Sequence, residues 1–106
     1  MLSANDESIL TEFARRVRDL FPSARIMAFG SRARGEAEQY SDFDICIVLN
    51  ELSDEAQEAI RDISWEVAYE HNMVFNTVAY SIWEFEEGPT ASSPLVANIL
   101  REGIAA

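Results

Sequence analysis

The sequence contains no lysine, one cysteine and one histidine among its 106 residues. A single cysteine excludes an intrachain disulfide framework. No apolar run approaches the length that is needed to cross a membrane, and the polar, acidic N-terminal segment lacks the features of a signal peptide. We therefore expect a cytoplasmic protein with no membrane partner. The length predicts a single domain over residues 1–106, with one small core.

Positive charge is also scarce. Eight arginines face 19 acidic residues, which gives a net charge of −11 at pH 7. Affinity for DNA or RNA depends on neutralising phosphates, so direct nucleic-acid binding is not expected. An acidic surface favours either simple solubility or a basic protein partner. The sequence leaves the oligomeric state open between a homo-oligomer and a hetero-oligomer.

The spacing of apolar residues predicts alternating helices and strands. A helix is predicted from about Ile9 to Leu20, followed by a strand over Arg25–Phe29 and a short helix over Ser31–Arg34. Further strands are predicted over Asp42–Leu49 and Met73–Ser81, with a helix between them that starts at Ser53 and a last helix that starts at Ser93-Pro94. This order predicts an α/β fold, a small mixed β-sheet with helices packed on one face.

Several aromatic and aliphatic side chains are interpreted as core. The helix after Ser53 presents an apolar stripe formed by Ala56, Ile60, Ile63 and Val67, with Ala59 and Trp65 as further candidates, and the last helix presents a face of four residues. Trp83 and Phe85 are also assigned to the core, with part of this C-terminal surface available to another chain. The four residues of the last helix are Leu95, Val96, Ile99 and Leu100.

The most informative stretch is Gly30 to Asp44, which reads GSRARGEAEQYSDFD. Gly30-Ser31 follows the first strand, where a glycine and a small hydroxyl residue let backbone N–H groups approach a phosphate. Asp42 and Asp44 lie at the start of the second strand and, because side chains alternate along a strand, they point to the same face. Two carboxylates on one face repel each other unless a cation neutralises them. Mg²⁺ suits such a pair, because it prefers hard oxygen ligands and keeps positions for water or phosphate.

Two arginines flank the predicted phosphate-binding turn. Arg32 or Arg34 could clamp a phosphate, since a guanidinium group matches phosphate oxygens in a fork geometry. They could equally pair with Glu36 and Glu38, and the sequence leaves both interpretations open.

The combination of strand, Gly-Ser, ten residues, Asp-x-Asp and a second strand resembles the nucleotidyltransferase superfamily of the DNA polymerase β type. The segment FGSRARGEAEQYSDFDICIVL and the short length resemble its minimal nucleotidyltransferase (MNT) branch. The resemblance extends from about Arg25 to Ile104 and implies the polymerase β palm-like fold. It also implies Mg²⁺, a nucleoside triphosphate held by Gly30, Ser31, Arg32 and Arg34, and a helical HEPN protein as partner in a toxin–antitoxin module.

The third carboxylate of this superfamily has no counterpart here. The matching strand reads Val74-Phe75-Asn76-Thr77-Val78, so Asn76 occupies the position. Its amide oxygen can still coordinate a metal, but the group carries no negative charge and is a poor base. Glu70 and Glu84 are the nearest acids, and both lie outside the predicted strand.

Two functional hypotheses follow from the resemblance. In the first, Asp42 and Asp44 are the catalytic and metal-binding carboxylates, aided by Asn76, and the protein transfers AMP from ATP to a hydroxyl of a HEPN toxin. In the second, the same fold has lost catalysis through Asn76 and neutralises its partner by direct binding. Cys46 is interpreted as a buried thiol and His71 as a dipole partner at a helix C-terminus.

Overall fold

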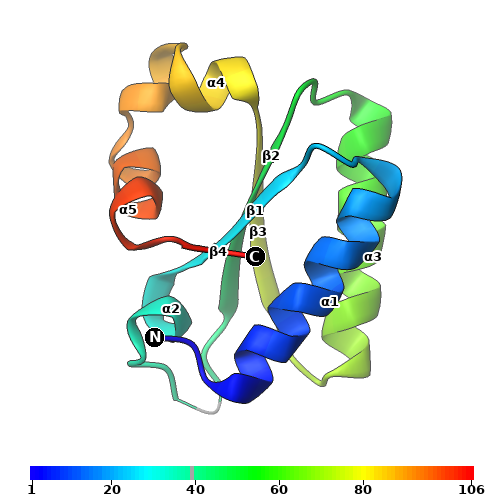
Figure 1. Ribbon diagram of the computed structural model, residues 1–106, viewed down its shortest axis with the longest axis vertical. Helices are drawn as coiled ribbons and strands as arrows, with labels where there is room; N and C mark the ends of the chain where they lie inside the picture. The colour runs from blue at the N-terminus through cyan, green and yellow to red at the C-terminus, as the bar shows by residue number, and fades with distance from the viewer. Residues whose placement is uncertain (39) are drawn as a thin grey trace.

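The computed structural model describes residues 1–38 and 40–106, and Figure 1 traces its elements. The helices are α1 (Ala4–Leu20), α2 (Gly30–Arg34), α3 (Asp54–Glu70), α4 (Ile82–Glu86) and α5 (Pro94–Glu102), with a 3-10 turn η1 (Pro89–Ser92). The strands are β1 (Arg25–Phe29), β2 (Phe43–Leu49), β3 (Phe75–Ser81) and β4 (Ile104–Ala105). The predicted α/β class is confirmed. The second strand begins at Phe43 rather than Asp42, the third begins at Phe75 rather than Met73, and the short α4 and β4 were not predicted.

The sheet is mixed, with strand order β3-β2-β1-β4. β2 and β3 are parallel and are joined by α3, as a parallel pair requires a crossover connection. β1 is antiparallel to both β2 and β4. The register pairs Asp44 with Phe29 on one side and with Asn76 on the other. The end of β1 and the starts of β2 and β3 therefore meet at one end of the sheet.

Helices cover both faces of the sheet, so the prediction of helices on one face is wrong (Figure 1). α1 and α3 pack against Ile26, Ala28, Ile45 and Ile47, whereas α4 and α5 contribute Phe85, Val96 and Ile99 to a second core on the other face. That second core contains the remaining strand residues Met27, Phe29, Cys46 and Val48. Strands buried on both faces read as continuous apolar runs without alternation, and β1 and β2 have this pattern.

A serine side chain caps the N-terminus of each of the three longest helices. Ser3 accepts a hydrogen bond from the Asp6 amide at 3.0 Å, Ser53 from the Ala56 amide at 3.1 Å, and Ser93 from the Val96 amide at 3.2 Å. Each hydroxyl satisfies one of the backbone donors that a helix start leaves unpaired. Within the described part of the chain, no helix combines the length and the apolarity that a membrane span requires.

Four side chains that were assigned to apolar faces are exposed instead. Trp65 is 68% exposed and Trp83 is 58% exposed. The exposed ring of Trp65 in α3 stacks on Tyr69, with 5.3 Å between the ring centroids. In α5 only Val96 and Ile99 are buried, while Leu95 and Leu100 face outwards. A helix of nine residues turns too few positions towards the sheet to bury all four.

Candidate functional site

Gly30 forms the turn between β1 and α2 and has a positive φ of 75°. A Cβ atom built at this position would lie 2.1 Å from Oδ2 of Asp44. Both the backbone conformation and the close approach therefore require glycine. This contact joins the two halves of the Gly30–Asp44 stretch, because the turn after β1 lies directly against the carboxylate of β2.

Three polar residues gather at this end of the sheet. Asp44 is half-buried in β2, Asp42 is exposed one residue before the strand, and Asn76 is exposed in β3. The Asn76 amide nitrogen Nδ2 donates a hydrogen bond to Oδ1 of Asp44 at 2.9 Å. The predicted alignment of Asn76 with the carboxylates of the second strand is thus confirmed. In residues 1–38 and 40–106, no arginine or histidine forms an ion pair with Asp42 or Asp44.

Glu70 and Glu84, the acids nearest to Asn76 in the sequence, both have other partners. Glu70 is bonded to Arg16 at 2.8 Å, on the side of the sheet that α1 and α3 cover. Glu84 accepts a hydrogen bond from the Ser81 amide at 3.0 Å, in the capping box of α4 that follows the far end of β3. Asn76 is therefore the β3 side chain that the fold presents to Asp44.

Glu102, at the end of α5, binds the turn before α2. Its Oε1 accepts a hydrogen bond from the Gly30 amide at 3.0 Å, and both of its carboxylate oxygens lie 3.2 Å from Nη1 of Arg34. The bond from Gly30, followed by the Arg34 guanidinium, lowers the pKa of the Glu102 carboxyl. Sequence reasoning missed this residue, because no local pattern links positions that are 72 residues apart.

The two arginines of α2 have different partners. Arg34 pairs with Glu36 at 3.1 Å, as one of the two sequence interpretations predicted, and also with Glu102. Arg32 instead forms an ion pair with Asp6 of α1 at 3.0 Å, and both side chains are about nine-tenths buried. Asp6 lies in the first turn of α1.

Cys46 and His71 have the structural settings that were predicted. Burial raises the pKa of the Cys46 thiol to about 12, so its reactive thiolate is not formed at neutral pH. His71 is the C-cap of α3, and its Nε2 lies 3.1 Å from a carboxylate oxygen of Glu12. Cys46 belongs to the core that α4 and α5 cover, and His71 contacts α1 through Glu12.

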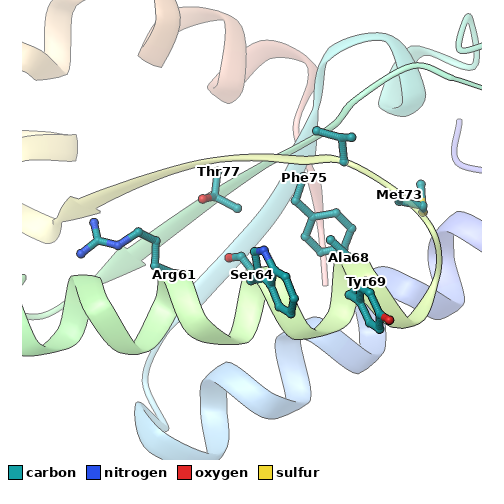
Figure 2. Close-up of a pocket in the computed structure, with 9 residues that line it drawn as sticks. Arg61, Ser64, Ala68, Tyr69, Met73, Phe75 and Thr77 are labelled. Atoms are coloured by element: carbon teal, nitrogen blue, oxygen red, sulfur yellow. The ribbon is translucent and has the colours of Figure 1, made fainter.

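An apolar groove of about 400 Å³ lies between α3 and β3 (Figure 2). Phe75 and Thr77 line its strand side, and Trp65 and Tyr69 lie on its helix side. Because side chains alternate along β3, Asn76 points to the opposite face. The groove is therefore separate from the acidic site.

The sequence matches the nucleotidyltransferase domain family over residues 10–105. The chain belongs to the nucleotidyltransferase domain family. The match includes the Gly30 turn, both aspartates and Asn76, so the contacts described above lie within this nucleotidyltransferase domain.

Two curated relatives are similar over part of the chain. The protein adenylyltransferase MntA of Thermococcus cleftensis is 44% identical over 46 residues, which cover 43% of this chain and 46% of the relative. The "probable protein adenylyltransferase MntA" of Haemophilus influenzae is 36% identical over 58 residues, 48% of this chain and 51% of the relative. The chain thus spans about half the length of the curated relatives it matches.

Solved structures share the fold of this nucleotidyltransferase domain. A toxin–antitoxin complex with AMP-PNP matches with a TM-score of 0.65 and 20% identity, over 90% of this chain and 69% of the other. A tri-AMPylated Shewanella oneidensis HEPN toxin in complex with its MNT antitoxin matches with a TM-score of 0.58 and 16% identity, over 94% and 70%.

Proposed function

We propose that this domain is a metal-dependent nucleotidyltransferase that transfers AMP from ATP to a hydroxyl group of a HEPN-type toxin, as the antitoxin of the pair. The proposal combines the family membership with the names of the relatives, which are protein adenylyltransferases. One observation carries it: the Gly30 turn, Asp44 and Asn76 come together at one end of the sheet. That arrangement offers phosphate-binding N–H groups beside metal-binding oxygens.

The donor set fits a divalent cation. Asp42 and Asp44 are acidic, and within the described chain neither has a basic side chain as ion-pair partner. Asn76 adds an amide oxygen, which is also a hard ligand. Mg²⁺ bound there would neutralise the carboxylates and draw in the phosphates of the nucleotide. We assign Asp42 and Asp44 as the carboxylate ligands and Asn76 as a neutral one.

The short helix α2 supports an anion-binding role for its residues Gly30, Ser31 and Arg34. The Glu102 carboxylate already sits between the Gly30 amide and the Arg34 guanidinium, which demonstrates that these two donors converge on one anion. We propose that the triphosphate binds at the same side of α2, with the Ser31 hydroxyl and the exposed Arg34 as further donors.

The proposed reaction is an in-line substitution at the α-phosphorus. The oxygen of the acceptor hydroxyl forms a bond to this phosphorus while the bond to the β-phosphate breaks, and pyrophosphate leaves. The proton of the attacking hydroxyl must go to a carboxylate or to water, because the neutral amide of Asn76 does not accept it. In this proposal the acceptor hydroxyl is presented by the HEPN-type partner.

The second candidate is an antitoxin that acts by binding alone. Asn76 favours it, because the third carboxylate position carries no charge and no neighbouring acid replaces it. Loss of that charge weakens the hold of a site on a second divalent cation. The two candidates differ in whether the toxin is covalently modified.

The deciding experiment measures the intact mass of a co-expressed HEPN partner after incubation with the purified domain, ATP and Mg²⁺. A gain of one or more AMP units is expected. The α,β-methylene analogue of ATP serves as the matched control, because its α–β bridge cannot be cleaved in this way. An unchanged mass beside a stable complex would favour the binding antitoxin.

Substitution of the carboxylates gives an independent check. We expect Asp42→Asn combined with Asp44→Asn to abolish the mass gain. If this double variant still protects cells from the toxin as well as the parent chain does, neutralisation does not depend on AMP transfer.

A further inference from the structure

The guanidinium group of Arg32 connects three segments that are distant in the sequence. Its Nη1 donates to both carboxylate oxygens of Asp6 in α1, at 3.0 and 3.1 Å. Its Nε and Nη2 donate to the backbone carbonyl of Ser41, at 3.1 and 2.8 Å. The group also lies over the ring of Phe43, with 5.8 Å to the ring centroid. One side chain thus joins α1, α2 and the start of β2.

The Ser41 carbonyl belongs to the residue directly before Asp42. The β2 ladder begins at Phe43, so Asp42 lies outside the regular hydrogen bonds of the sheet. Its backbone is held on one side by Phe43, whose amide donates to the Val74 carbonyl at 2.9 Å. On the other side it is held by the contact between Ser41 and Arg32.

The environment of Arg32 suits an internal contact. The side chain of Arg32 is 10% exposed and that of Asp6 is 7% exposed. A buried ion pair is stable only when both partners are present and well bonded, because removing one leaves an uncompensated charge. Arg34, in contrast, is 43% exposed and can reach a ligand in solvent. The two arginines of α2 are thereby suited to different tasks.

We propose that Arg32 is a positioning residue that holds Asp42 at the metal site by fixing the Ser41 carbonyl against α2, with Asp6 orienting the guanidinium. The proposal rests on the proposed function, in which Asp42 is a metal ligand. Arg32 follows Gly30-Ser31 directly, so its side chain ties the phosphate-binding turn to the loop that delivers the carboxylate. Residues that orient a metal ligand typically contribute about 10- to 100-fold to metal affinity or activity.

The test separates positioning from stability by exchanging the two charges. In the variant Asp6→Arg with Arg32→Asp the ion pair is restored, but an aspartate at position 32 cannot donate to the Ser41 carbonyl. We expect the thermal stability to return close to that of the parent chain. Mn²⁺ affinity in the presence of AMP-PNP, measured by electron paramagnetic resonance, should fall by about 10-fold or more.

A second pair of substitutions keeps the test decisive if the exchanged pair does not fold. Asp6→Leu with Arg32→Met removes both charges together, which buried sites often tolerate. This variant also lacks a donor to Ser41, so the same loss of Mn²⁺ affinity is expected. In the metal-free chain, faster amide hydrogen exchange at Ser41 and Asp42 should accompany it, and this readout does not depend on catalysis.

The matched control exchanges the ion pair that joins α1 to α3, Arg16→Glu with Glu70→Arg. It should leave the Mn²⁺ affinity and the exchange of Asp42 unchanged. Parent-like Mn²⁺ affinity in a folded Arg32 variant would overturn the positioning role. If the parent chain binds Mn²⁺ with AMP-PNP but transfers no AMP, the proposed function is wrong. The role of Arg32 is then decided only by comparing the Mn²⁺ affinity of the Arg32 variants with that of the parent chain.

Discussion

Gly30 offers the sharpest prediction on how the fold builds the site. An alanine there must adopt a φ of 75°, which costs an L-residue about 1–2 kcal/mol. Its Cβ would also lie 2.1 Å from Oδ2 of Asp44, so the carboxylate must rotate away and release the Asn76 amide. Losing that hydrogen bond adds about 1 kcal/mol. We expect Gly30→Ala to lower the free energy of unfolding by about 2–3 kcal/mol, the sum of these terms.

Gly35 provides a matched control for the backbone term. It has the same φ of 75°, but a Cβ there would meet its nearest atom, the Met1 carbonyl oxygen, at 3.3 Å. Gly35→Ala should therefore cost only the conformational term of about 1–2 kcal/mol. Urea denaturation of both variants gives the difference, which is the contribution of Asp44.

A double-mutant cycle then assigns that difference to one side chain. In a background of Asp44→Ala, the added Cβ at position 30 no longer meets a carboxylate, so the cost of Gly30→Ala should fall by about 1 kcal/mol. Equal costs for Gly30→Ala and Gly35→Ala, or no coupling to Asp44, would refute the argument that the carboxylate and the turn share this space.

Three further predictions concern the site and the core. Without divalent cations, Asn76→Asp should lower the melting temperature, because it replaces a hydrogen-bond donor 2.9 Å from Asp44 by a second negative charge. Adding Mg²⁺ should restore the melting temperature. If AMP transfer occurs, the rate of transfer should rise about 10²-fold or more. Cys46 should resist maleimide in the native state at pH 8 and react once urea unfolds the chain, because burial holds its pKa at about 12; fast native labelling would contradict this. The pKa of Glu102 is lowered in the folded chain, so the stability that this carboxylate contributes is present above its ordinary pKa of 4.5 and is lost as the pH falls through the lower folded pKa. In the variant Glu102→Gln, the free energy of unfolding should therefore depend less steeply on pH below pH 4.5 than in the parent chain.

Local patterns were sufficient to predict most of the elements. Serine caps and apolar spacing located four of the helices but not α4, and short apolar runs located three strands, because these signals depend on neighbours within a few residues. The same reasoning placed Asp42 and Asp44 on one face. The resemblance to the nucleotidyltransferase superfamily, rather than a local pattern, identified Asn76 as the matching position on the next strand, and the register pairs it with Asp44.

The prediction that helices cover only one face of the sheet was wrong, and the strand sequences already carried the signal for helices on both faces. The strands Ile26–Phe29 and Ile45–Leu49 lack polar alternation, and such runs are typical of strands covered on both faces. Trp65 was misassigned because hydrophobicity alone does not distinguish a core residue from an exposed aromatic one. Its side chain stacks on Tyr69 at the surface of α3 instead.

The sequence by itself determined most of the elements, the Gly30 turn and the acidic pair, because each depends on residues that are close along the chain. Only the tertiary structure decided that Asp6 binds Arg32 and that Glu102 binds Gly30 and Arg34. These partners are 26, 72 and 68 residues apart, so no periodicity connects them. They meet because α1 and α5 pack on opposite faces of the sheet and both reach its end at α2.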